Sequence, residues 1–211
     1  MWRKQLTIGV LVSFCTFVAH AAAQRNELSG AQKNELSGLV GRQFISDQII
    51  PTSTSSDNLL RFGNGLSFEG NIARRVMDGQ LLAVSLEVPV VFNVDEDVHT
   101  HNNPVSPGYR AFFVTPAARL NLFAHTAVSP WVSVGGGLSY FNGSATQFQP
   151  KTGTTAGVFQ IGGGLDVTLY RKFSLRGELR DFWSGVPKLN VSANQSRQHN
   201  LFVGGGVVWH F

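Results

Sequence analysis

The segment Leu201-Phe-Val-Gly-Gly-Gly-Val-Val-Trp-His-Phe211 closes the sequence and alternates in character with a period of two. Counting back from Phe211 in steps of two reaches Trp209, Val207 and Val203. Side chains two residues apart lie on the same face of a β-strand, so this strand would have one large apolar face. Soluble domains usually place polar, frayed residues at their ends. The segment therefore predicts a terminal strand that is apolar on one side up to its last residue.

The beginning of the chain has the layout of a secretory signal peptide. Arg3-Lys4 provides a short basic start, an apolar stretch runs from Leu6 to Val18, and small residues follow at Ala21–Ala23. The apolar stretch is shorter than the roughly 20 residues that a membrane-spanning helix needs. We expect cleavage after Ala21 or Ala23. The predicted organisation is a signal peptide at 1–23, a flexible lead-in at 24–36 and one folded domain at 37–211.

Removal of the signal peptide changes what the composition allows. Cys15, the one cysteine, leaves with it, so disulfides and thiolate chemistry are excluded from the mature chain. Without Arg3 and Lys4, 15 basic side chains face 13 acidic ones. This excess is too small to indicate nucleic-acid binding. No later segment is apolar over the length of a membrane-spanning helix, so a membrane role would have to use strands.

Seven further segments show period-two alternation between turn signals. They cover about 37–45, 60–74, 80–93, 109–122, 130–141, 156–170 and 173–183. In most of them the large apolar residues share one face, and the opposite face holds the smaller and charged residues. Short links alternate with long polar ones, which fall at about 46–59, 93–108, 142–155 and 184–198.

Eight strands with short turns at one end and long loops at the other are typical of a transmembrane barrel. A soluble barrel of the lipocalin kind would instead place its apolar residues inside. The sequence therefore predicts an all-β, eight-stranded antiparallel up-and-down β-barrel over residues 37–211, with a polar lumen. The lipid-facing belt, with aromatic anchors near its edges, is expected to include Phe62, Phe68, Phe112, Leu120, Tyr140, Phe159, Leu175, Trp209 and Phe211.

With these strands, the mature chain resembles the small eight-stranded outer-membrane β-barrels typified by the transmembrane domain of outer membrane protein A. In such proteins the terminal aromatic is the signal read by the barrel-assembly machinery, and Trp209 and Phe211 match it here. The resemblance implies export, periplasmic chaperones, insertion among outer-membrane lipids, and a monomer that ends with its barrel. The fold serves envelope stabilisers, adhesins, small channels and enzymes, so it does not choose among these functions.

Strand parity directs a set of charged side chains into the lumen. Acids and bases nearly balance in this set, so we expect paired ions, because an unpaired buried ion is costly. The pairs could form a rigid plug, or a gated ion path that opens by exchanging partners. We favour the plug because side chains just fill an eight-stranded interior. The expected members are Glu69, Glu87, Arg119, Asp166, Arg176, Glu178 and Arg180, joined by Arg61 and Arg42.

Three strands share a glycine triplet, at Gly135–Gly137, Gly162–Gly164 and Gly204–Gly206. A nucleotide-binding glycine loop needs a turn into a helix after it, whereas here the strand pattern continues. Glycine in these strands allows tight coiling of a small barrel and leaves space for long side chains that cross the lumen. The triplets therefore predict a structural role.

One outer connection holds Asp95, Glu96, Asp97, His99 and His101, whose oxygen and imidazole groups could bind calcium or zinc. Polar loops collect such residues without binding metal, so no metal site and no cofactor are predicted.

Enzymes that modify lipid A acyl chains also use eight-stranded barrels, and the deacylase type sets His, Ser and an acid on the outer wall. Ser184, Ser192, Ser196, His199 and Asp181 lie toward the extracellular ends of the last two strands, but nothing in the sequence sets their spacing. The sequence thus predicts a non-enzymatic protein with a structural or surface-interaction role. A lipid A-modifying enzyme and a narrow solute or ion pore are the alternatives.

Overall fold

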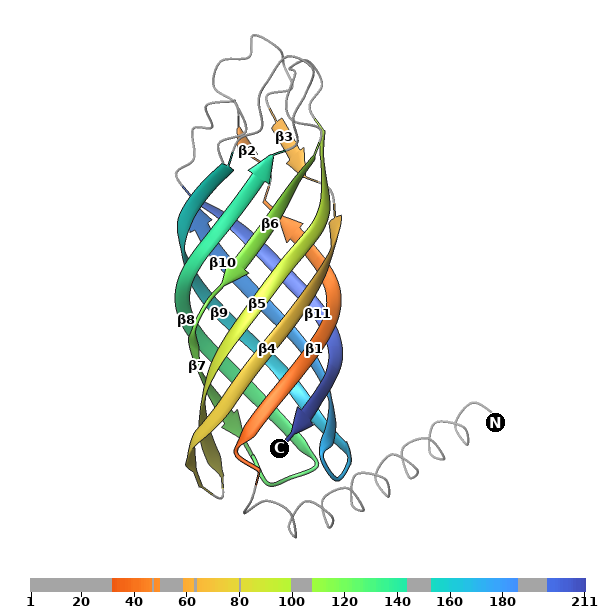
Figure 1. Ribbon diagram of the computed structural model, residues 1–211, viewed down its shortest axis with the longest axis vertical. Helices are drawn as coiled ribbons and strands as arrows, with labels where there is room; N and C mark the ends of the chain where they lie inside the picture. The colour runs from red at the N-terminus through yellow and green to blue at the C-terminus, as the bar shows by residue number, and fades with distance from the viewer. Residues whose placement is uncertain are drawn as a thin grey trace, which may run out of the picture.

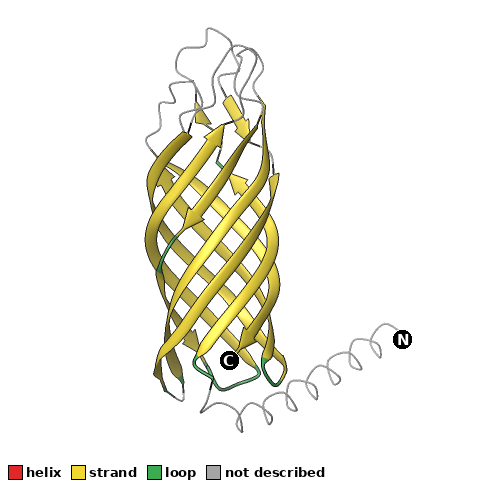
Figure 2. Ribbon diagram, viewed as in Figure 1, coloured by secondary structure: helices red, strands yellow, loops and turns green. Residues whose placement is uncertain are grey.

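The computed structural model describes residues 32–46, 48–49, 59–62, 64–79, 81–99, 108–143, 153–185 and 197–211. All regular structure in these ranges is β (Figure 2). The strands are β1 (Asn34–Ile45), β2 (Gln48–Ile49), β3 (Leu59–Phe62), β4 (Asn64–Asp78), β5 (Leu82–His99), β6 (Gly108–Val114), β7 (Ala117–Leu122), β8 (Val128–Gly143), β9 (Gly153–Tyr170), β10 (Phe173–Gly185) and β11 (Arg197–His210). A helix long and apolar enough to cross a membrane does not occur in the described ranges.

The long strands close into one antiparallel barrel of eight, in which β6 and β7 together form the fourth strand (Figure 1). Strands that follow one another in the chain pair side by side, and β11 returns to pair with β1. The closing register sets Glu35 opposite His210 and Ile45 opposite Asn200. Because the barrel is closed, none of its described strands has an unpaired edge. Lipid could not provide hydrogen-bond partners for the backbone N–H and C=O groups of such an edge. The predicted fold class is confirmed.

The fourth barrel strand is interrupted at Thr115-Pro116, between β6 and β7. Both pieces pair with β5 on one side and β8 on the other. Pro116 has no N–H to donate to the ladder, so the regular pairing stops there. Its carbonyl oxygen accepts a hydrogen bond from Gly136 N at 3.1 Å, and Thr115 N donates to Pro89 O at 3.2 Å. The wall is therefore continuous across the break.

The links β4–β5, β7–β8 and β9–β10 lie at one end of the barrel, beside the C-terminus (Figure 1). We call this the short-turn end. Phe211 and Asn34 exchange backbone hydrogen bonds of 2.9 and 3.0 Å there. β1 begins at Asn34, so it takes in residues 34–36, which were expected to belong to the lead-in. The predicted signal peptide at 1–23 lies outside the described residues.

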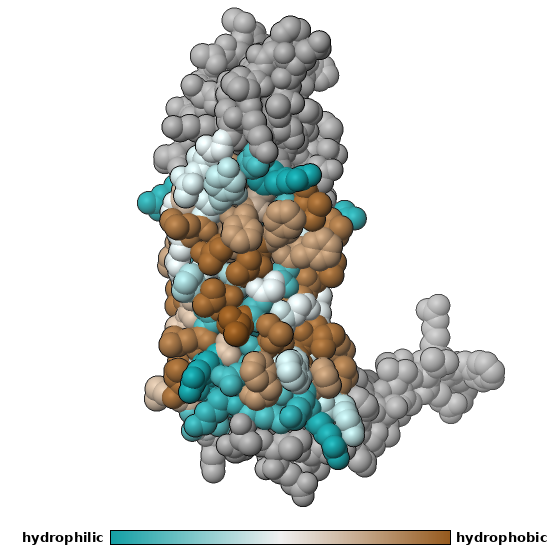
Figure 3. Space-filling model, viewed as in Figure 1, coloured by the Kyte–Doolittle hydropathy of each residue, from teal (hydrophilic) through white to brown (hydrophobic). Residues whose placement is uncertain are grey.

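Apolar side chains form a band around the visible face of the barrel, with hydrophilic residues at both ends of the band (Figure 3). Leu120 in the predicted belt is half-buried, and the Phe62 side chain lies outside the described part of the structure. The other predicted belt residues expose 39–48% of their surface, namely Phe68, Phe112, Tyr140, Phe159, Leu175, Trp209 and Phe211.

The interior has two layers, an ionic one toward the short-turn end and an aromatic one toward the opposite end. The aromatic layer consists of Phe113, Phe141, Phe182 and Phe202, all of them at most 1% exposed. The ring of Phe113 stacks on Phe182 with centroids 4.8 Å apart and meets Phe141 edge-on at 5.7 Å. A small barrel with such an interior is packed like a core and is not lined like a channel.

Candidate functional site

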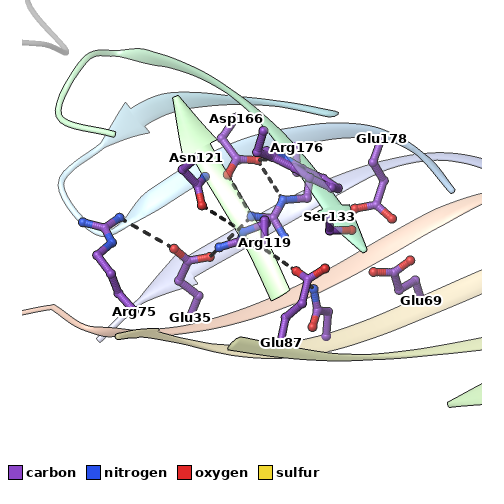
Figure 4. A network of polar contacts seen from close by, with 12 residues as sticks. Glu35, Glu69, Arg75, Glu87, Arg119, Asn121, Ser133, Asp166, Arg176 and Glu178 are labelled. Carbon is purple, nitrogen blue, oxygen red and sulfur yellow. Dashed lines mark hydrogen bonds and ion pairs between the residues drawn. The ribbon is translucent and has the colours of Figure 1, made fainter. Parts of the chain in front are cut away.

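The charged side chains of the ionic layer form a connected set that we call the lumen network (Figure 4). Its members come from six of the barrel strands and reach the interior because every second residue of a strand points inward. The seven predicted members are 0–5% exposed, and two residues that the prediction did not contain join them. The network comprises Glu35, Glu69, Arg75, Glu87, Arg119, Asp166, Arg176, Glu178 and Arg180.

Glu35 is the centre of the network at the short-turn end. It accepts a hydrogen bond from Arg119, and its Oε2 atom lies 3.4 Å from Arg176 Nη2. Arg75 Nη2 lies 3.9 Å from the other carboxylate oxygen. Arg176 also holds Asp166 through two hydrogen bonds, of 2.7 and 2.8 Å, in a fork geometry. One carboxylate from β1 is thereby tied to strands on the other side of the barrel.

Arg180 is the centre of the next part of the network. Its guanidinium lies 2.7 Å from Glu178, 2.8 Å from Glu87 and 3.3 Å from Glu69. Arg119 lies 3.3 Å from Glu87 and joins the two parts. The ion pairs thus run without a break from Glu35 to Glu69.

Trp131, on β8, occupies the middle of the network. The guanidinium carbons of Arg119, Arg176 and Arg180 lie 5.7, 5.2 and 5.1 Å from its ring, within the range of cation–π attraction. Its Nε1 atom donates a hydrogen bond of 3.2 Å to Asp166. The indole therefore fills the space between three cations and holds one of their counter-ions.

The sequence prediction missed Glu35, Arg75 and Trp131. Glu35 was placed before the first strand, although the alternation of inward and outward residues in β1 extends back to it. Trp131 precedes Val132 on the strand and so lies on the opposite, inward face, a signal that parity already contained. Arg75 shares the inward parity of Glu69, but the predicted segment ended at residue 74, one residue before it.

The prediction that Arg42 points into the lumen is wrong. Arg42 is exposed on the outside of the barrel, and the inward residues of β1 are Glu35, Ser37, Leu39, Gln43 and Ile45. The error came from treating Gln43 as an interruption of the lipid-facing side, when it is a buried lumen residue. The side chain of Arg61 lies outside the described part of the structure.

The other sequence candidates separate into two groups. Asp95 to His99 lie in β5, but their side chains fall outside the described part of the structure. His101 is not among the described residues. Where side chains are described, no cluster of three or more His, Cys, Asp or Glu could hold a metal. Asp181 and His199 meet on the outer wall, whereas Ser184 is buried on the inner side. Ser192 and Ser196 are not among the described residues.

No protein-family model matches the chain, and no curated protein matches it in sequence. Solved structures do match. Neisserial surface protein A is 10% identical with a TM-score of 0.54, over 84% of this chain and 97% of that one. The outer membrane protein OprG from Pseudomonas aeruginosa is 9% identical with a TM-score of 0.55, over 86% and 96%. The fold is that of the small eight-stranded outer-membrane β-barrels. At these identities the likeness shows the fold alone.

The matching structures also correct one prediction. They include the outer membrane enzyme PagL, 11% identical over 82% of this chain and 97% of that one, with a TM-score of 0.45. They also include the outer membrane protease OmpT from Escherichia coli, 7% identical over 85% and 97%, with a TM-score of 0.46. The prediction that this chain is not an enzyme is therefore corrected, because the matching structures include two enzymes and the enzymatic status of this chain is not established. At such low sequence identity, no enzymatic activity is inferred for this chain from these structures.

Proposed function

We propose that the protein is an integral outer-membrane barrel with a closed lumen, which has a structural or surface-interaction role and does not conduct solutes. The observation that carries this proposal is the lumen network around Trp131, which joins strands across the interior. Insertion through the assembly machinery and periplasmic chaperones, and contact with outer-membrane lipids, belong to the same proposal.

Two properties of the interior favour a plug over a gated path. Arg176 and Arg180 each make ion pairs of 2.7–2.8 Å while almost fully buried, so exchange of partners would leave buried charges uncompensated. Beyond the ions, the aromatic layer of Phe113, Phe141, Phe182 and Phe202 offers a passing ion no charged partner of its own. An ion that crossed this layer would lose its hydration without gaining a partner, which is costly in free energy.

Conductance of the purified protein in planar lipid bilayers tests the closed lumen. We expect no steady conductance from wild type. Folding of the sample is verified independently by the different gel mobilities of unheated and boiled protein. Steady wild-type currents that change on Arg176→Ala or Glu87→Ala would show that the network lines a path and would overturn the proposal.

A further inference from the structure

Asp181 on β10 and His199 on β11 form a hydrogen-bonded pair on the outer wall of the barrel. His199 Nδ1 lies 2.6 Å from Asp181 Oδ2, and the side chains are 54% and 26% exposed. The imidazole also stacks on the indole of Trp183, with ring centroids 5.2 Å apart and planes 21° apart. The ring is therefore held from two directions. Where the structure describes possible partners, it records no hydrogen bond at Nε2.

Ser46 follows β1 and lies directly beside His199. Ser46 N donates to His199 O at 3.2 Å, and His199 N donates to Ser46 Oγ at 3.3 Å. Residues opposite each other in antiparallel strands point to the same face, with Cβ atoms roughly 5 Å apart. The Ser46 side chain therefore lies beside the imidazole on the same face of the sheet. Its oxygen accepts the His199 N–H, and to donate its proton to the imidazole the hydroxyl must turn from that N–H toward the ring.

These three residues lie at the end of the apolar band that is remote from the short turns. Phe44 and Trp183, both exposed, are their neighbours on the same outer face. Arg197 lies one position further out, with its guanidinium 5.5 Å from the Trp183 ring. Asp181 Oδ1 is buried and has no hydrogen-bond donor among the described residues. An ionisable pair facing lipid is costly, and such residues commonly serve a function.

We propose that Ser46, His199 and Asp181 form a hydrolytic site on the outer wall that cleaves a carboxylic ester of an outer-leaflet lipid. Asp181 holds Nδ1 protonated, which leaves Nε2 as the base. Nε2 takes the Ser46 proton as Oγ attacks the ester carbonyl. The C–O bond to the lipid alcohol then breaks, and the alkoxide leaves with that proton. Water attacks the acyl-serine in the same way, releasing a fatty acid and restoring Ser46.

The position of the site indicates its substrate. It faces the bilayer, so a lipid reaches it by lateral diffusion, and ester groups lie near the boundary between acyl chains and headgroups. Arg197, on the outward side, suits a phosphate or another anion of the headgroup. Both lipid A and glycerophospholipids carry such esters next to phosphates. The chemistry on the protein does not depend on which of the two is the source.

The test measures fatty acid released by the folded full-length barrel in vesicles of either phosphatidylethanolamine or lipid A, by mass spectrometry. We expect release from at least one lipid, and the two arms identify the source. Ser46→Ala and His199→Gln should each lower the rate by 100-fold or more, since the step loses its nucleophile or its base. Ser184→Ala is the matched control, because Ser184 points inward beside Trp183, and it should retain the wild-type rate.

Asp181 acts through His199 and is therefore a positioning residue, which requires its own readout. Asp181→Asn should lower kcat by about 10- to 100-fold with little change in KM, and Asp181→Glu should restore part of the loss. A long-chain alkyl fluorophosphonate should label Ser46 in wild type and not in His199→Gln. Absence of fatty acid from both lipids with folded wild type, or wild-type rates in Ser46→Ala, would overturn the proposal. Neither result bears on whether the lumen conducts, so the closed-barrel proposal is tested separately.

Discussion

Arg180 illustrates at the scale of a single residue why the lumen network is sensitive to change. Its guanidinium is fully buried and compensates Glu69, Glu87 and Glu178 together. Each carboxylate has been moved out of water, so each depends on the cation that remains close to it. Glu69 depends on it most, because neither of its oxygens accepts a hydrogen bond from another described residue.

We expect Arg180→Met to lower the free energy of unfolding by about 3–5 kcal/mol, because it leaves buried carboxylates without their cation. Urea unfolding of the barrel in phospholipid vesicles, followed by tryptophan fluorescence, measures the change. Arg74→Met is the control, since Arg74 is exposed on the outer face, and its effect should stay within about 0.5 kcal/mol. Equal stability of the two variants would show that the ion pairs contribute little.

At the scale of the element, β11 requires glycine where the neighbouring strand approaches closely. A Cβ atom at Gly206 would lie 2.0 Å from the carbonyl oxygen of Gly38 on β1, and one at Gly204 would lie 2.5 Å from the Phe202 ring. At Gly205, which faces outward, the nearest atom would be 3.6 Å away. The triplet therefore combines two inward positions where a side chain would force a neighbour to shift with an outward one where it would not.

Gly206→Ala and Gly205→Ala form a matched pair one residue apart. Gly206→Ala should lower the free energy of unfolding by about 1–3 kcal/mol, because the backbone of β1 would have to shift at the seam that closes the barrel. Gly205→Ala should change it by less than about 0.5 kcal/mol. The same urea titration measures both, and similar values for the two variants would refute the close-approach explanation.

A substitution at the end of β11 can distinguish a role in assembly in cells from a role in stability. Phe211 stacks on Trp209 with ring centroids 4.8 Å apart, while its pairing with Asn34 uses backbone atoms only. We therefore expect Phe211→Ala to refold in detergent almost as wild type does, yet to accumulate several-fold less in the outer membrane. Cell fractionation and gels of unheated samples measure this. A parallel loss of refolding in vitro would mean that the aromatic acts through stability and is not an assembly signal.

At the scale of the whole molecule, gel electrophoresis tests whether the barrel is closed. A closed barrel with a cross-linked interior should resist dodecyl sulfate at room temperature and open on boiling. Unheated protein should therefore migrate faster than boiled protein. Identical mobilities for the two samples would count against a closed barrel in the membrane.

Much of this architecture follows from local patterning. The period-two alternation located all eight barrel strands, because lipid outside and ions inside impose opposite chemistry on successive residues. Its bounds were less accurate, since β5 continues six residues beyond the predicted end at 93 and the predicted segment 60–74 joins β3 to β4. It failed at Arg42, where the wrong face of β1 was taken as apolar, and at Glu35, where the strand was begun too late. In both cases the first strand had too few large apolar residues on its outer side to set its parity.

Outside the first strand, the sequence by itself determined which side chains face lipid and which face the lumen, since that depends on the two-residue repeat of a strand. Only the tertiary structure decided which of them meet. The hydrogen bond from Arg176 to Glu35 spans 141 residues, and the one that joins His199 to Ser46 spans 153. Both exist because β11 closes against β1 in one register, and a register between the ends of a chain depends on every strand pairing that separates them.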